Sequence, residues 1–133
     1  MKRSTGFTLI ELMVALVIVA ILAVIALPSY TRYIQRGDLV AGTQALSQYR
    51  VQMEQYYQDN NTYSNAGNCG VAVPTPANFT VTCALGGANA YTATATGTGP
   101  VVGFTYTIDQ NNTQKTPNAP SGWSTSTTAW VMR

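Results

Sequence analysis

Residues 7–27 read FTLIELMVALVIVAILAVIAL, and this stretch decides the fold. The run is nearly all apolar, and its single charged residue is Glu11. A helix rises about 1.5 Å per residue, so the run spans roughly 30 Å, the thickness of one hydrocarbon core. The sequence therefore predicts an N-terminal helix that is long enough to cross a membrane.

The residues on either side of this run help to distinguish a signal peptide from a membrane anchor. Lys2 and Arg3 precede it, which favours a cytoplasmic N-terminus. A secretory signal peptide would have a shorter apolar core and a small-residue cleavage site, which residues 27–29 do not offer. A plain membrane anchor explains the length but not Glu11, because an acidic side chain at the centre of a spanning helix costs about 2.5–3.5 kcal/mol. Such a residue is a functional candidate by default.

The junction Gly6-Phe7-Thr8-Leu9-Ile10-Glu11-Leu12 resembles the processing signal of type IV pilins. This signal has a small residue, then Phe, then Glu at the fifth mature position, and it opens an apolar helix. The resemblance implies that a prepilin peptidase cuts between Gly6 and Phe7 and that the new amine of Phe7 is methylated. Glycine suits the cut because the enzyme can approach its backbone closely.

The same resemblance implies how the mature chain assembles. The amine of Phe7 would meet Glu11 of a neighbouring subunit and neutralise two charges inside an apolar bundle. Pro28 stands where such pilins often carry a proline. The expected parts are a leader at 1–6, a membrane and filament-core helix at 7–28, and a head at 29–133 that includes the second half of the helix. The chain would lie in the inner membrane before assembly and in an extracellular pilus afterwards.

Pro28 either ends the helix or bends it, because proline removes a backbone hydrogen bond. Apolar and small residues recur beyond it at helical spacing, which favours one continued helix over residues 7–58, about 75–80 Å long. We expect this stripe to pack on a sheet of the same chain rather than to form a partner-binding groove. Its members are Leu39, Gly42, Leu46, Tyr49, Met53 and Tyr56.

The remaining chain alternates as strands do. Three alternating runs begin at Phe79, Tyr91 and Phe104, and Thr113–Thr116 follows as a short return strand after a polar turn. The expected fold class is α+β, a type IV pilin fold. Its long N-terminal helix would pack on three or four antiparallel strands.

Two cysteines suit one disulfide, Cys69 to Cys83, in a chain that leaves the cytoplasm. Such a bridge contributes about 3 kcal/mol in the loop-entropy model, and two free buried thiols are the alternative. No cysteine follows Cys83, so residues 117–133 must be held by packing, with Trp123 and Trp130 as anchors. The early pair resembles PilE-type pilins, which are often minor ones.

The composition also limits the function. The chain has no histidine, which excludes histidine-based catalysis and histidine-containing metal sites, and it shows no nucleophile motif. We therefore expect no enzyme, metal or cofactor. The expected function is that of a type IV pilus subunit, major or minor, in adhesion, motility or DNA uptake. The alternative is a pseudopilin of a type II secretion system, which shares the processing signal.

The resemblance further implies the partners. These are other pilin subunits, the prepilin peptidase and the assembly machinery of the inner membrane. DNA is a further candidate, for which Arg50, Lys115, Arg133 and several tyrosines are available. The charges balance once Lys2 and Arg3 are removed with the leader, and this argues against DNA.

Overall fold

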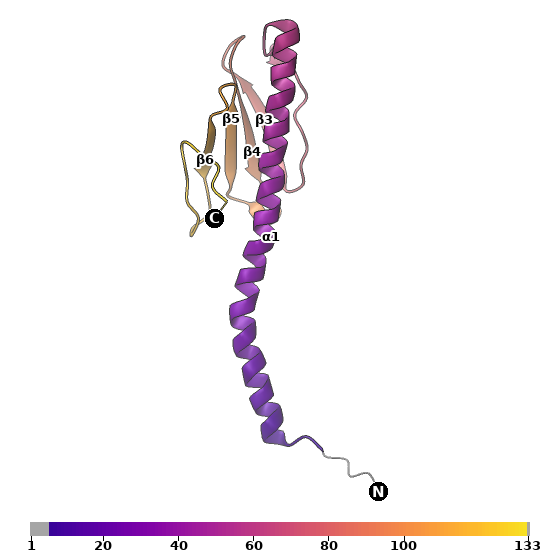
Figure 1. Cartoon of the computed structure of the whole chain (residues 1–133), viewed down its shortest axis with the longest axis vertical. Coiled ribbons are helices and arrows are strands. Elements are labelled where there is room, and N and C mark those ends of the chain that lie inside the picture. The colour runs from indigo at the N-terminus through magenta and orange to yellow at the C-terminus, as the bar shows by residue number, and fades with distance from the viewer. Residues whose placement is uncertain (1–5, 133) are drawn as a thin grey trace. The chain divides into compact units, whose positions relative to one another are not determined.

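The computed structural model describes residues 6–132, so the leader residues Lys2 and Arg3, and also Arg133, lie outside it. The chain divides into two compact units, Met1–Ile34 and Gln35–Arg133. Helix α1, Leu9–Asn60, begins in the first unit and ends in the second. The strands follow it and all belong to the second unit (Figure 1).

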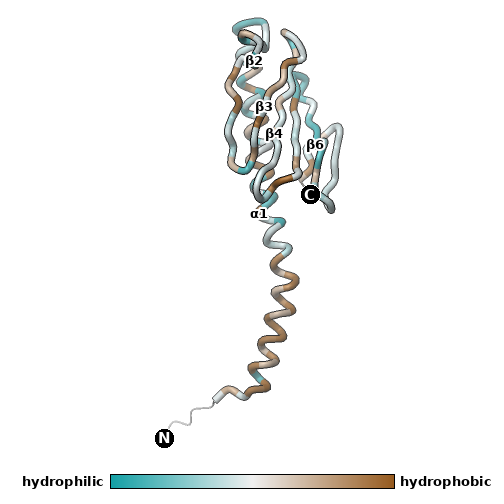
Figure 2. Tube along the Cα trace, turned by 180° about the vertical axis from the view of Figure 1, so that it is seen from behind, coloured by the Kyte–Doolittle hydropathy of each residue, from teal (hydrophilic) through white to brown (hydrophobic). Residues whose placement is uncertain are grey.

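Helix α1 passes through Pro28 without ending there, as the continued-helix prediction requires. One turn further on, the hydroxyl of Thr31 donates to the carbonyl oxygens of Leu27 and Pro28, at 3.0 Å and 3.1 Å. Figure 2 shows the N-terminal part of α1 as an almost continuous apolar stretch. The side chains of this stretch are exposed, apart from the half-buried Ala23.

In the second unit, four strands form one antiparallel sheet in the order β3-β4-β5-β6. All four strands that the sequence predicts are present. A 3-10 turn, η1 (Gly99–Val101), lies between the second and third strands of the sheet. The strands are β3 (Phe79–Leu85), β4 (Tyr91–Gly97), β5 (Thr105–Asp109) and β6 (Gln114–Asn118).

A second, two-stranded sheet was not predicted. It is a small antiparallel hairpin of β1 (Ser64–Asn65) and β2 (Asn68–Cys69) in the connection that follows α1. Strands of two residues are too short to produce the alternation by which a strand is recognised in a sequence.

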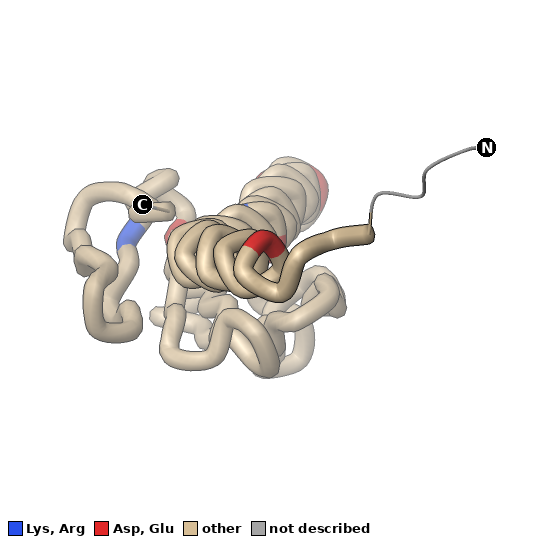
Figure 3. The backbone as a smooth tube through the Cα atoms, turned by 90° about the horizontal axis from the view of Figure 1, so that it is seen from below, with Lys and Arg blue, Asp and Glu red and all other residues tan. Residues whose placement is uncertain are grey.

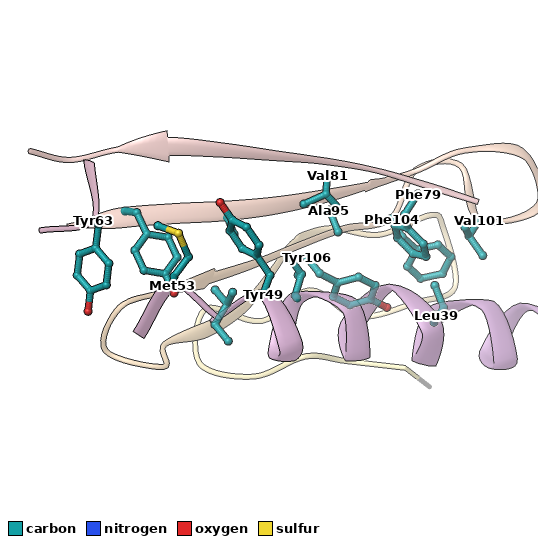
Figure 4. Packing of buried hydrophobic residues seen from close by; sticks show 14 residues of the cluster. Leu39, Tyr49, Met53, Tyr63, Phe79, Val81, Ala95, Val101, Phe104 and Tyr106 are labelled. Atoms are coloured by element: carbon teal, nitrogen blue, oxygen red, sulfur yellow. The ribbon is translucent and has the colours of Figure 1, made fainter. Parts of the chain in front are cut away.

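The core of the second unit lies between α1 and one face of the four-stranded sheet. Figure 4 shows Leu39 of the helix facing Phe79 and Phe104, with Tyr49 and Tyr106 further along. The predicted helical stripe is buried except for Tyr56, which is half-buried, and Thr43 joins it. Thr43 satisfies its hydroxyl within the helix, by donating to the carbonyl oxygens of Leu39 and Val40.

Gly42 lets the helix and the sheet approach closely. A Cβ atom added at Gly42 would lie 2.6 Å from the ring of Phe79 on β3, closer than Cβ atoms come to other heavy atoms. At Gly37, one and a half turns earlier in α1, an added Cβ would meet nothing within 4 Å. Gly42 therefore has a packing role that Gly37 lacks.

Candidate functional site

The start of α1 carries a local structure around Thr8 and Glu11. The backbone N–H of Glu11 donates to Thr8 Oγ1 at 3.3 Å, and the Thr8 hydroxyl lies 3.4 Å from Glu11 Oε2. A threonine followed three residues later by glutamate is a helix-start signature, because the two side chains satisfy free groups of the first turn. Thr8 therefore caps the first turn through the backbone N–H of Glu11, and the Glu11 carboxylate accepts from the Thr8 hydroxyl within one chain. The sequence analysis missed this role, although the spacing of Thr8 and Glu11 could have revealed it.

The apolar surface that follows has no cover within the first unit. Phe7 is 75 % exposed and Leu9 78 % exposed, and the large apolar side chains up to Leu27 are exposed by half or more. The apolar part of α1 is long enough to cross a membrane by length and composition alone, a criterion that a signal sequence also meets. Apolar surface of this extent requires lipid or other protein chains around it.

The predicted processing and assembly residues all lie in the first unit. Gly6 and Phe7 precede the helix and are exposed, Glu11 lies in its first turn, and Pro28 lies inside it. An added Cβ at Gly6 would meet nothing within 4 Å, so the junction is open to another protein.

Cys69 and Cys83 form the predicted disulfide, with a Cα–Cα distance of 6.3 Å and a sequence separation of 14. The bridge ties β2 to β3, which is an edge strand of the sheet. A hydrogen bond from the hydroxyl of Tyr49 to the carbonyl oxygen of Val71, 3.0 Å long, fixes the next part of the connection to the core. The segment between helix and sheet is thus fastened covalently and by a buried tyrosine.

Thr116 fastens the C-terminal segment at the opposite edge of the sheet. Its backbone exchanges two hydrogen bonds with Ser126, of 2.7 Å and 3.0 Å. Its hydroxyl donates to the carbonyl oxygen of Ala129 at 3.1 Å and accepts from the N–H of Val131 at 2.9 Å. The side chain is fully buried. Nothing distinguishes Thr116 from the many other threonines in the sequence, so the sequence analysis missed it.

The two tryptophans act as the predicted anchors of this segment. The ring of Trp123 meets Phe104 edge-on, with 5.0 Å between ring centroids. Trp130 Nε1 donates to the carbonyl oxygen of Thr107 at 2.9 Å, and the Tyr106 hydroxyl donates to that of Val131 at 2.8 Å. Side-chain hydrogen bonds and aromatic packing thus hold the segment without a disulfide of its own.

The titratable groups of the core are the hydroxyls of buried tyrosines. Burial raises the pKa of Tyr49 and of Tyr106 to about 12, and it also raises the pKa of Tyr91. These phenols stay neutral near neutral pH, and two of them donate the hydrogen bonds described above. Among the described residues, no three His, Cys, Asp or Glu side chains are placed to hold a metal ion.

Two family models match the chain, and together they cover residues 1–107. Residues 1–27 match the prokaryotic N-terminal methylation motif. Residues 28–107 match the model described as type IV minor pilin ComP, DNA uptake sequence receptor. The second match covers more than half of the chain.

Individual relatives agree with these models. The chain is 32 % identical to the type IV wide pilus major component PilA4 of Thermus thermophilus over 90 % of this chain and 97 % of that protein. It is 33 % identical to the fimbrial protein EcpC of Eikenella corrodens over 74 % of this chain and 67 % of that protein. It is 37 % identical to a probable minor fimbrial protein of Dichelobacter nodosus over 47 % of this chain and 39 % of that protein. With its long N-terminal helix, four-stranded antiparallel sheet and methylation motif, the chain belongs to the type IV pilin family.

Proposed function

We propose that this chain is a structural subunit of a type IV pilus, made as a precursor that is cut between Gly6 and Phe7 and methylated on Phe7. The observation that carries the proposal is the exposed apolar surface of α1, directly after an open Gly6-Phe7 junction. The lipid bilayer covers this surface before assembly, and the helices of other subunits cover it in the filament. The names of the relatives, which are pilus and fimbrial proteins, support a pilus over a secretion pseudopilus.

The partners follow from this life cycle. A prepilin peptidase removes residues 1–6 at the membrane, and the assembly machinery of the inner membrane transfers the mature chain into the filament. Lys2 and Arg3 hold the leader on the cytoplasmic side until the cut. The head, residues 29–133, lies on the outer side of the inner membrane and then on the filament.

Glu11 has an assembly role in addition to its place at the helix start. In the filament its carboxylate pairs with the methylated amine of Phe7 in an adjacent subunit, so neither charge is left alone among apolar helices. Glu11→Gln tests this role, because it removes the charge and retains the length and an oxygen for the Thr8 hydroxyl. We expect Glu11→Gln precursor to be cut normally and incorporated into sheared filaments at least about tenfold less than the unsubstituted chain.

Processing is tested separately with Gly6→Leu. The precursor should accumulate in the membrane uncut, as seen by immunoblotting and by N-terminal mass spectrometry, because the leucine side chain blocks the close approach of the enzyme. Normal maturation of Gly6→Leu would refute the assigned junction. Normal incorporation of Glu11→Gln would refute the pairing and leave the junction intact.

DNA binding is a second candidate function, favoured by the description of the family model that matches residues 28–107. The charges of the second unit do not favour it, because its four basic residues are balanced by four acidic ones. The basic residues are Arg36, Arg50, Lys115 and Arg133. The acidic residues are Asp38, Glu54, Asp59 and Asp109.

A gel shift with purified filaments and duplex DNA at several salt concentrations tests this function. Binding by this chain requires that the affinity falls with salt, and a contact through Lys115 requires that Lys115→Gln weakens it. Equal affinity of the Lys115→Gln and unsubstituted filaments would exclude Lys115 as a contact, and no binding at low salt would exclude the function.

A further inference from the structure

The sheet face turned away from α1 is made almost entirely of threonine. The residues that alternate with the buried ones on β3, β4 and β5 lie in cross-strand register, with Thr80, Thr96 and Thr105 in one row and Thr82, Thr94 and Thr107 in the next. A third row contains Ala84, Thr92 and Asp109. We call the seven threonines of these rows the threonine face.

The threonine face has no cover in the described part of the chain, and its hydroxyl groups have no hydrogen-bond partners there. Its members are exposed or half-buried, whereas the residues between them on the strands are buried against the helix. None of the seven hydroxyl groups takes part in the side-chain hydrogen bonds of residues 6–132, although the hydroxyls of Thr43 and Thr116 do. Each hydroxyl therefore remains free both to donate and to accept.

Charge is nearly absent from this face, in keeping with the sparse charged positions along the chain (Figure 3). In the described chain, two charged residues lie at the margin of the threonine face, and their charges have opposite signs. Asp109 closes the third row, and its Oδ1 accepts the backbone N–H groups of Asn111 and Thr113. Lys115 of β6 is exposed and lies in register with Thr107.

These properties fit one kind of partner, a second copy of the same face. A hydroxyl that donates and accepts can bond to an identical hydroxyl, so two threonine faces are complementary to each other. Strands lie about 4.8 Å apart and alternate residues about 6.8 Å apart, so both faces carry the same lattice. The two marginal charges have opposite signs, so a register that brings Lys115 of one copy to Asp109 of the other is favoured over one that opposes like charges. A sugar is a poorer fit, because the large aromatic side chains of these strands are buried on the opposite face.

The size of the face determines where this contact is useful. Three strands and five residues along each strand cover roughly 250 Å² per copy. A stable interface buries about 800 Å² per partner, so one pair of faces does not hold two free chains together. A filament presents the face on every subunit, and many weak contacts in parallel become strong.

We propose that the threonine face is the lateral contact between neighbouring filaments of this protein. The inference rests on the proposed function, since it requires a polymer with helix α1 inside and the opposite face of the sheet outside. Filaments would associate side by side through facing threonine lattices, and single chains would not associate through them.

Charge on the middle strand of the lattice provides the test. Thr96 lies in the middle strand and is exposed, so lysine or glutamate fits there without entering the core. Thr75, which is exposed in the connection before β3, gives the matched control Thr75→Lys. Sheared filaments are quantified first, and their lateral association is then measured by low-speed sedimentation and electron microscopy.

We expect Thr96→Lys and Thr96→Glu each to form the normal amount of filament and to lower low-speed sedimentation about fivefold or more. Thr75→Lys should sediment like the unsubstituted filament. A mixture of Thr96→Lys and Thr96→Glu filaments should regain sedimentation at low salt and lose it again at high salt.

Filaments of Thr96→Lys that associate as the unsubstituted ones do would overturn the inference, as would an equal loss in Thr75→Lys. Unsubstituted filaments that form but stay single would overturn it as well, and would leave the proposed function standing. Failure of the unsubstituted chain to form any filament would overturn the proposed function itself.

Discussion

Replacing Thr116 by valine removes the hydroxyl that holds the C-terminal segment and changes the shape of the side chain little. The carbonyl oxygen of Ala129 and the N–H of Val131 each lose their partner, at 3.1 Å and 2.9 Å, beside a fully buried side chain. Two lost hydrogen bonds with unsatisfied groups cost about 2–4 kcal/mol. Thr116→Ser is the matched control, because it retains the hydroxyl and loses one methyl group, worth about 1 kcal/mol.

Two assays distinguish local opening of the C-terminal segment from a loss of stability of the whole fold. Urea unfolding followed by tryptophan fluorescence gives the change in the free energy of unfolding, and hydrogen exchange over residues 119–132 shows whether the segment opens by itself. We expect Thr116→Val to speed exchange in this segment well before the sheet unfolds, and Thr116→Ser to exchange nearly as the unsubstituted chain does. Equal exchange in the valine and serine variants would refute the role given to the hydroxyl.

Three further changes test other parts of the fold. Gly37→Ala should stabilise α1 by up to about 1 kcal/mol. Gly42→Ala should destabilise the protein by about 1–2 kcal/mol, because its methyl group displaces the ring of Phe79. Urea unfolding measures both variants, and a change of the same sign in their free energies of unfolding would contradict the close packing at Gly42. Replacing both cysteines by serine should lower the free energy of unfolding by about 3 kcal/mol, and reducing the disulfide of the unsubstituted chain should lower it by as much. Equal melting temperatures with and without reductant would show that the disulfide does not stabilise the fold. Folding raises the pKa of Tyr49 and Tyr106 from 10.0 to about 12. The free energy of unfolding should therefore not depend on these groups below pH 10, and it should fall as the pH rises towards 12, by up to about 1.4 kcal/mol per pH unit for each tyrosine. Urea unfolding at pH 9 to 12 measures this fall, and a flat profile would contradict the burial of the two tyrosines.

The features that the sequence predicts are those with a strong periodic or covalent signal. These features are the helix, the four main strands and the Cys69–Cys83 bridge. The spacing of apolar residues and an even cysteine count can both be read directly from the sequence. Glu11 also stands out, because a lone charge in an apolar run is rare.

The features that it does not predict depend on contacts between distant residues. Thr116 is one threonine among many, and only the return of the C-terminal segment past β6 makes it a buried hydrogen-bonding residue. Gly42 is visible as a small residue in the helical stripe, but its contact with Phe79 requires the packing of helix on sheet. The threonine face likewise requires the strand register, because alternation alone does not say which threonines become neighbours.

The N-terminal residue of the protein in sheared filaments tests the central claim most directly. Mass spectrometry of the N-terminal peptide should find a chain that begins at Phe7 and carries a methyl group on its amine. A peptide that begins at Met1, or at any residue other than Phe7, would contradict the account, because the amine of Phe7 would then not exist to pair with Glu11.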